Sequence, residues 1–234
     1  MNQKNKKQII LLDGGMGQEL IKRSKSPPHP LWSSHVLMHE PELVEQLHVD
    51  FINAGASVIT LNTYTATPER LERDGASGMF NQIQNKAVEV AKRARDRCRG
   101  KDVKIAGCLP PLYGSYKPEA APSFEECVER YSVIAKKQRP NVDLFICETM
   151  SSIKEAKAAI TAATAHNIET WCSLSIKDDK RSTLRSNEKL SDAIARLKQL
   201  DHQANLINCS IPESISISLN ILQGDTKPFG AYAN

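Results

Sequence analysis

Residues 8–17 read Gln8-Ile9-Ile10-Leu11-Leu12-Asp13-Gly14-Gly15-Met16-Gly17, an apolar run that ends in a carboxylate and three glycines. A short apolar run closed by glycines is typical of a buried β-strand. Asp13 would then stand at the C-terminal end of the strand, where barrels and open α/β sheets bind ligands. The glycines would let the backbone approach a ligand closely. A plain turn with Asp13 as a turn residue fits the same stretch, so the rest of the chain has to decide between the two.

Short apolar strands alternate with helical stretches along the rest of the chain. The further expected strands are 57–61, 103–108, 142–147, 169–175, 204–209 and 228–234. The expected helices are 41–53, 79–98, 123–138, 152–165, 189–200 and 212–222. Residues 24–34 are rich in Ser, Pro and His and are expected to form a loop. Such alternation predicts βα units on a parallel sheet.

The lack of a dinucleotide fingerprint in this βα series favours one particular α/β fold. Gly14-Gly15-Met16-Gly17 is not a G-x-G-x-x-G dinucleotide fingerprint, so the series favours a (β/α)8 TIM barrel over a Rossmann sheet. Seven strands are expected, so the barrel would be incomplete, with the eighth βα unit missing. No linker divides the chain, and residues 1–234 are expected to form a single barrel domain truncated at its C-terminus. Open strand edges would then make the isolated chain poorly soluble or unstable.

Composition argues against several classes of protein. The 234 residues are 40% hydrophobic and 25% charged, with a net charge of +4. Aromatic residues make up 5% and basic residues are mostly scattered, which argues against a nucleic-acid surface. No apolar run approaches the ~20 residues that span a bilayer, and the lysine-rich start is unlike a signal peptide. Six sparse cysteines indicate reduced thiols and a cytoplasmic protein; oligomeric state cannot be read from the sequence.

Polar residues follow the expected strands at their C-terminal ends. Any one of them could simply cap a loop, but parallel strands bring all these ends to one mouth, and the coincidence indicates a candidate site. The residues concerned are Asp13, Asn62, Thr63, Tyr64, Cys108, Glu148, Thr149, Ser173, Ser175, Asn208, Cys209 and Asn234.

Several chemistries fit these residues. Asp13 and Glu148 could form an acid/base pair, as in glycosidases, or could bind the ammonium group of an amino acid. Cys209 could be a nucleophile, a zinc ligand or a buried thiol. No histidine stands at a strand end, which counts against a nucleophile, and no C-x-x-C motif is present to support a structural zinc site.

The chain resembles the homocysteine S-methyltransferase family, zinc-dependent (β/α)8 enzymes that methylate homocysteine to methionine. Four ordered segments carry the resemblance and together span most of the chain. They are Leu11-Leu12-Asp13-Gly14-Gly15-Met16-Gly17-Gln18-Glu19-Leu20, Ala54-Gly55-Ala56-Ser57-Val58-Ile59-Thr60-Leu61-Asn62-Thr63-Tyr64, Asp143-Leu144-Phe145-Ile146-Cys147-Glu148-Thr149 and Leu206-Ile207-Asn208-Cys209-Ser210.

The resemblance implies a role for each matching residue. Asp13 and Glu148 would hold the amino-acid end of homocysteine. Gly14 and Gly15 would bring the backbone close to it, and Asn62, Thr63 and Tyr64 would line the pocket. Cys209 matches the first of three zinc-binding cysteines. The partners implied are homocysteine and a small methyl donor of the sulfonium type, with Zn2+ as cofactor.

The family's other two zinc ligands, an adjacent Cys-Cys pair, are absent, and Cys209 is the last cysteine. Three thiolates allow zinc to take the substrate sulfur as a fourth ligand and keep it deprotonated, which one cysteine cannot do. The chain is therefore expected to be inactive as written. Two alternatives stay open: a non-catalytic descendant that binds an amino acid or a partner, and a carboxylate-based barrel hydrolase or lyase.

The methyl donor cannot be read from the sequence. Residues 109–116, Leu-Pro-Pro-Leu-Tyr-Gly-Ser-Tyr, could shape the donor side of the site or form a proline-stiffened loop, and the second interpretation is slightly favoured.

Overall fold

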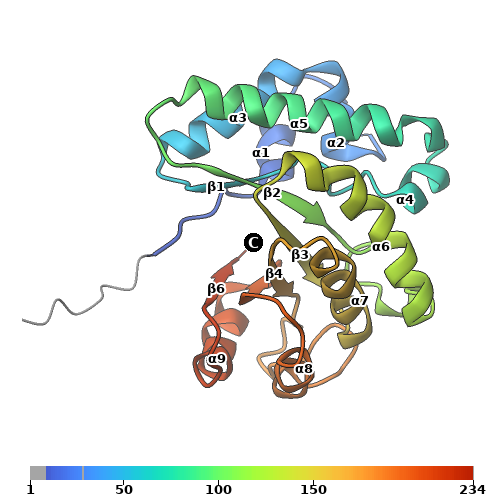
Figure 1. Cartoon of the computed structure of the whole chain (residues 1–234), viewed down its shortest axis with the longest axis vertical. Helices are drawn as coiled ribbons and strands as arrows, with labels where there is room; N and C mark the ends of the chain where they lie inside the picture. Colours follow the sequence, from blue (N-terminus) through green and yellow to red (C-terminus); the bar gives the residue numbers. More distant parts are fainter. Residues whose placement is uncertain (1–8, 28, 234) are drawn as a thin grey trace, which may run out of the picture.

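The computed structural model describes residues 9–27 and 29–233 (Figure 1). Gln8 and Asn234, at the ends of the first and last expected strands, lie outside this part. Six parallel strands lie side by side in their order along the chain. They are β1 (Val58–Thr60), β2 (Lys104–Leu109), β3 (Leu144–Met150), β4 (Glu169–Leu174), β5 (Ala204–Asn208) and β6 (Phe229–Tyr232).

Helices connect successive strands, and all six predicted helices are confirmed to within a few residues. They are α3 (Pro41–Asn53), α5 (Phe80–Arg97), α6 (Phe124–Gln138), α7 (Ile153–Thr164), α8 (Leu190–Leu197) and α9 (Pro212–Gln223). Local signals explain several starts: Pro41 and Pro212 take first helical positions, and Ser123 with Glu126 forms a capping box.

Three further helices were not predicted: α1 (Met16–Arg23), α2 (Trp32–His39) and α4 (Pro68–Arg73). The prediction of a loop over 24–34 is wrong at its end, because α2 begins at Trp32. The helix α4 had a readable signal, since Thr67 caps it and Pro68 takes its first position.

The prediction of a first buried strand before Asp13 is wrong for the described residues. Leu12 forms only an isolated parallel bridge with Val58, while Ile9, Ile10 and Leu11 are 90%, 52% and 50% exposed. This segment lies beside β1 with no further strand covering it among the described residues. An apolar strand is buried only when neighbours cover both its faces. The structure therefore has six strands and one bridge where seven strands were expected.

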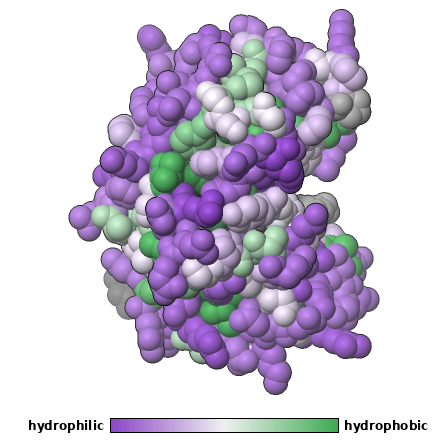
Figure 2. Space-filling view, turned by 90° about the vertical axis from the view of Figure 1, so that its right-hand side faces the viewer, coloured by the Kyte–Doolittle hydropathy of each residue, from purple (hydrophilic) through white to green (hydrophobic). Residues whose placement is uncertain are grey.

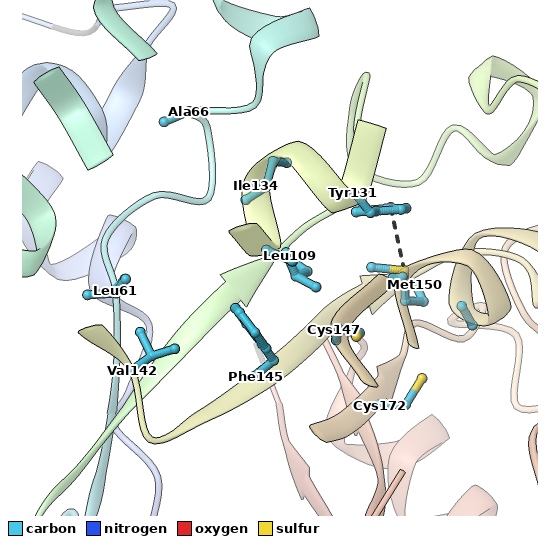
Figure 3. Packing of buried hydrophobic residues seen from close by; sticks show 14 of the residues in the cluster. Leu61, Ala66, Leu109, Tyr131, Ile134, Val142, Phe145, Cys147, Met150 and Cys172 are labelled. Atoms are coloured by element: carbon cyan, nitrogen blue, oxygen red, sulfur yellow. Dashed lines mark hydrogen bonds between the residues drawn. The ribbon is translucent and has the colours of Figure 1, made fainter. Parts of the chain in front are cut away.

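The sheet curls into a half-barrel with helices on its outer side, which confirms an α/β, TIM-barrel-like fold (Figure 1). Alternating side chains divide each strand between two cores. On β3, Leu144 and Ile146 join an inner cluster, whereas Phe145 and Cys147 join the larger core beneath the helices. Figure 3 shows Phe145 beside Leu109, and the Tyr131 hydroxyl of α6 donates to the Met150 sulfur over 3.8 Å.

The helical layer presents a polar outer surface. The face seen in Figure 2 is mainly hydrophilic, with apolar residues in small scattered patches. None of the helices in the described ranges combines the length and the apolar character needed to cross a bilayer. Since all six strands are parallel, their C-terminal ends lie at one end of the half-barrel.

Candidate active site

A cavity of about 780 Å3 opens at the C-terminal ends of the strands. Of the eight residues to which the family resemblance assigns a role, seven line it: Asp13, Gly14, Gly15, Asn62, Tyr64, Glu148 and Cys209. The eighth, Thr63, is 1% exposed and lies behind the wall, where its hydroxyl accepts a hydrogen bond from Gln138. Parallel strand register thus brings together residues that are up to 196 positions apart in the chain (209 − 13).

Asp13 is held in place by β1. The Thr60 backbone N–H donates to Oδ2 over 2.7 Å, and the Thr60 hydroxyl donates to Oδ1 over 3.1 Å. Burial raises the pKa of Asp13 to about 7. The hydrogen bonds from Thr60 lower this pKa, but the effect of burial is larger. The nearby Glu148 charge raises it further, so the carboxyl titrates close to neutral pH.

Glu148 comes from the β3 end of the same cavity. The Cys108 thiol donates to its Oε1 over 2.8 Å. Burial raises the pKa of Glu148, while the bond from Cys108 and the charge of Arg70 lower it. Two half-buried carboxyls therefore share one cavity, which favours a cationic ligand between them.

Asn62 joins the β1 end to α2, and Tyr64 joins it to the loop that follows β2. The Asn62 side-chain amide donates to the Ser33 carbonyl over 3.1 Å, and the Tyr64 hydroxyl lies 2.7 Å from the Ser115 hydroxyl. The buried Arg70 guanidinium lies 5.0 Å from the centre of the Tyr64 ring. Burial raises the pKa of Tyr64, so its phenol stays protonated and can donate a hydrogen bond.

Cys209 follows β5 and is the one partly exposed cysteine in the described ranges; Cys98, Cys108, Cys127, Cys147 and Cys172 are buried. Its sulfur accepts hydrogen bonds from the Thr149 hydroxyl over 3.4 Å and from the Asn208 amide over 3.3 Å. Burial raises the pKa of the Cys209 thiol, partly offset by the bond from Thr149.

Strained backbone surrounds this cavity. Trp32, Tyr116, Thr149 and Cys209 have φ angles of 45°, 62°, 59° and 51°. Left-handed backbone is uncommon for residues with a Cβ and concentrates at functional sites. The carbonyl of Cys209 accepts a hydrogen bond from Arg185 over 3.0 Å, which helps hold this conformation.

Sequence reasoning missed several cavity residues. Trp32 lines the cavity and packs against Gly17, where a Cβ would come within 2.9 Å of the indole ring. Ser115 and Tyr116 also line it, although the favoured interpretation of residues 109–116 was a stiff loop. Trp32 lies in a segment rich in Ser and Pro with no regular hydrophobic pattern, so this segment does not indicate that its side chain lines the cavity. The glycine at position 17 was the one local hint of a close approach.

The described residues do not fit a zinc site of three thiolates. No group of three or more His, Cys, Asp or Glu side chains suited to a metal ion occurs in residues 9–27 and 29–233. Cys209 is the one cysteine among the residues that line the cavity in that part of the chain. A zinc ion that binds substrate takes three protein ligands, so these residues alone do not hold it.

The strand-end cavity and its carboxylates agree with a comparison to known protein families. The family model described as Homocysteine S-methyltransferase matches residues 10–234. The chain belongs to the homocysteine S-methyltransferase family. Its relatives therefore bear on the interpretation of the cavity.

Two bacterial relatives and one plant relative illustrate the family. Homocysteine S-methyltransferase of Escherichia coli is 30% identical over 250 residues, covering 98% of this chain and 79% of that protein. Homocysteine S-methyltransferase YbgG of Bacillus subtilis is 29% identical, covering 97% and 77%. Selenocysteine Se-methyltransferase of Brassica oleracea is 28% identical, covering 96% and 72%.

A solved structure has the same fold. The crystal structure of the homocysteine methyltransferase MmuM from Escherichia coli, in its metallated form, superposes with a TM-score of 0.87 at 29% identity. The superposition covers 97% of this chain and 84% of that one.

Proposed function

We propose that this protein is a homocysteine S-methyltransferase, which transfers a methyl group from a sulfonium-type donor to the sulfur of homocysteine and yields methionine. One observation carries the proposal: Asp13, Glu148 and Cys209 line a single strand-end cavity in a chain of this family. The names of the relatives support the same substrate class.

The two carboxylates are proposed to bind the ammonium group of homocysteine. Asp13 is fixed by Thr60 and Glu148 by Cys108, so both acceptors are oriented before the ligand arrives. Gly14 and Gly15 bring the backbone to the same wall, and Asn62 and Tyr64 line the cavity beside them. Thr63 would support this wall from behind.

Methylation requires the homocysteine thiol to lose its proton and attack the methyl carbon, while the donor sulfur leaves as a neutral thioether. In the family this activation is assigned to zinc, and Cys209 would be one ligand. The described residues contribute a single cavity thiol and do not by themselves hold the metal. The structural neighbour described as metallated supports a metal in the family without naming it.

The single thiol also favours a second candidate function, in which the chain binds an amino acid without turning it over. Both proposals share the binding of the ammonium group by Asp13 and Glu148, called the carboxylate clamp below. They differ in the metal-dependent chemistry. We further propose that residues 1–234 belong to one barrel domain and that the protein is cytoplasmic. The six free cysteines support the last point.

Calorimetric titration with homocysteine tests the shared part. The chain should bind L-homocysteine, and Asp13→Asn and Glu148→Gln should each weaken binding about tenfold or more. Methionine formation from S-methylmethionine in zinc-containing buffer then separates the two candidates. Unchanged binding in both carboxylate variants would overturn the clamp.

A further inference from the structure

The Cys108 thiol lies directly behind the Glu148 carboxylate. Cys108 is fully buried, lies on β2 and is absent from the residues that line the cavity. Its Sγ is 2.8 Å from Glu148 Oε1. Burial raises the pKa of this thiol well above its ordinary value, so at neutral pH the sulfur carries a proton and donates it.

Gln138, at the end of α6, fixes Cys108 in turn. The Gln138 Oε1 accepts from the Cys108 backbone N–H over 2.9 Å. Its Nε2 group contacts the Thr63 hydroxyl at 3.2 Å, the Gln84 Oε1 at 3.0 Å and the Cys108 carbonyl at 3.3 Å. One buried amide therefore ties the chain after β1 to the end of β2.

The strand β2 has space for this amide because residue 107 is glycine. A Cβ there would lie 2.5 Å from the Phe145 ring and 2.7 Å from Gln138 Oε1. Figure 3 shows the Phe145 ring standing out from β3 in the core beneath the helices. Glycine within a strand marks such a close approach.

We propose that Cys108 is the positioning residue of Glu148: Gln138 fixes the Cys108 backbone, and the Cys108 thiol aims the Glu148 carboxylate into the cavity toward the ammonium group of an amino-acid ligand. The proposal rests on the proposed function for the identity of the ligand. It adds a residue that does not touch the cavity and acts on binding only through Glu148.

Other groups also act on Glu148, and they have to stay unchanged in the test. The buried Arg70 charge favours the Glu148 carboxylate, and the Glu148 charge in turn raises the pKa of Asp13. The ionisable groups that interact with Glu148 are Asp13, Tyr64, Arg70, Cys108, Cys147, Cys209 and Tyr232. Substitution of Cys108 alone leaves the other six in place.

The test compares L-homocysteine with 4-mercaptobutanoate, which lacks the amino group. The Kd of 4-mercaptobutanoate divided by the Kd of L-homocysteine measures recognition of the ammonium group alone. Cys108→Val removes the donor on a strand that accepts a β-branched residue, and it should lower this ratio about fivefold. Cys108→Ser keeps a donor and should restore the ratio to near that of the wild type. Cys172→Val, another buried cysteine on β4, is the matched control and should leave it unchanged.

A second readout needs no ligand. In protein with 13C-labelled glutamate, the Cδ resonance that disappears in Glu148→Gln reports the Glu148 titration. Its midpoint should move to higher pH in Cys108→Val and return in Cys108→Ser, because the thiol bond favours the charged form. A purely structural role would weaken both ligands equally and leave the midpoint in place.

The outcomes distinguish the role of Cys108 from the proposed function. An unchanged ratio and an unchanged midpoint in a folded Cys108→Val protein overturn the role of Cys108. If homocysteine binding in that case still depends on Glu148, the proposed function stands. If wild-type protein binds no homocysteine, the proposed function fails with the ligand part of the inference, and the midpoint alone decides whether Cys108 controls Glu148. If Cys108→Val does not fold, Cys108→Ala repeats the comparison.

Discussion

Thr60 donates two hydrogen bonds to the carboxylate of Asp13, one from its backbone and one from its side chain, at 2.7 Å and 3.1 Å. Asp13 belongs to the chain segment beside β1, and Thr60 is the last residue of β1. The pair therefore fixes a cavity carboxylate to the edge of the sheet, on a segment that is otherwise joined to it through few contacts.

Replacement of Thr60 by Val tests this pair. Val has nearly the same shape but lacks the hydroxyl, so Asp13 loses one donor and its pKa should rise further. Homocysteine binding at pH 7 should weaken about three- to tenfold, as measured by calorimetry. Thr60→Ser keeps the hydroxyl and should restore binding. Equal affinity in the Val variant and the wild type would show that the side-chain bond is dispensable.

Amino-acid binding should depend on pH near neutrality. The pKa of Asp13 is raised to about 7, so the carboxylate that attracts the ammonium group becomes protonated as the pH falls through 7. Affinity should be constant above that pH and decrease toward pH 5.5, measured as Kd in a series of buffers. Asp13→Asn should bind more weakly at pH 8 and lose most of the dependence. A wild-type Kd that stays constant from pH 8 to 5.5 would contradict this titration.

The position of Trp32 should depend on Gly17. A Cβ at residue 17 would meet three ring atoms of Trp32 at 2.9–3.1 Å. Gly17→Ala should destabilise the protein by about 1–3 kcal/mol, measured by denaturant unfolding, and should shift the tryptophan fluorescence. Gly78→Ala is the control, since no atom lies within 4 Å of the added carbon, and it should be neutral. A stable Gly17→Ala variant with unchanged fluorescence would refute the contact.

Zinc retention separates the two candidate functions. One thiol in the cavity holds zinc weakly, so protein purified and dialysed without chelator should contain much less than one zinc per chain by mass spectrometry. Cys209→Ser should reduce any residual zinc further. One tightly retained zinc per chain would contradict this expectation and would favour the full methyltransferase reaction.

The exposed apolar residues before Asp13 should promote self-association. Ile9, Ile10 and Leu11 are each at least half exposed, and Phe229 on the outermost strand β6 is 42% exposed. Light scattering should show that the average molar mass of the protein in solution increases with protein concentration. Ile10→Lys should reduce this association, because a lysine on an exposed edge opposes pairing. Ile217→Lys, on an exposed position of α9, is the control.

Local sequence patterns predicted most of the fold because most of it has local causes. The runs 142–147 and 204–209 are apolar and short, and helices cover them on one side and neighbouring strands flank them, so burial follows from composition. The segment before Asp13 is more apolar than either run but lacks such neighbours, so residues 9–11 are exposed. Burial of a segment depends on the elements that pack beside it, and the composition of the segment alone does not predict those elements.

The candidate site divides in the same way. Asp13, Glu148 and Cys209 were found because each follows an expected strand, and parallel strands bring their ends together. Trp32 and the Cys108–Glu148 contact were missed because they depend on side chains that meet across 15 to 40 positions (32 − 17 and 148 − 108). Such contacts follow from packing, which periodicity does not encode.

The strand order β1 to β6 also bears on how the chain is made. Each strand pairs with the one synthesised just before it, so its partner has already left the ribosome when it emerges. The half-barrel can therefore grow by addition at one edge during translation, at about 5–20 residues per second. In that sequence of events Asp13 and Glu148 emerge before the last part of the cavity wall, because Cys209 follows β5 and Tyr232 lies on β6.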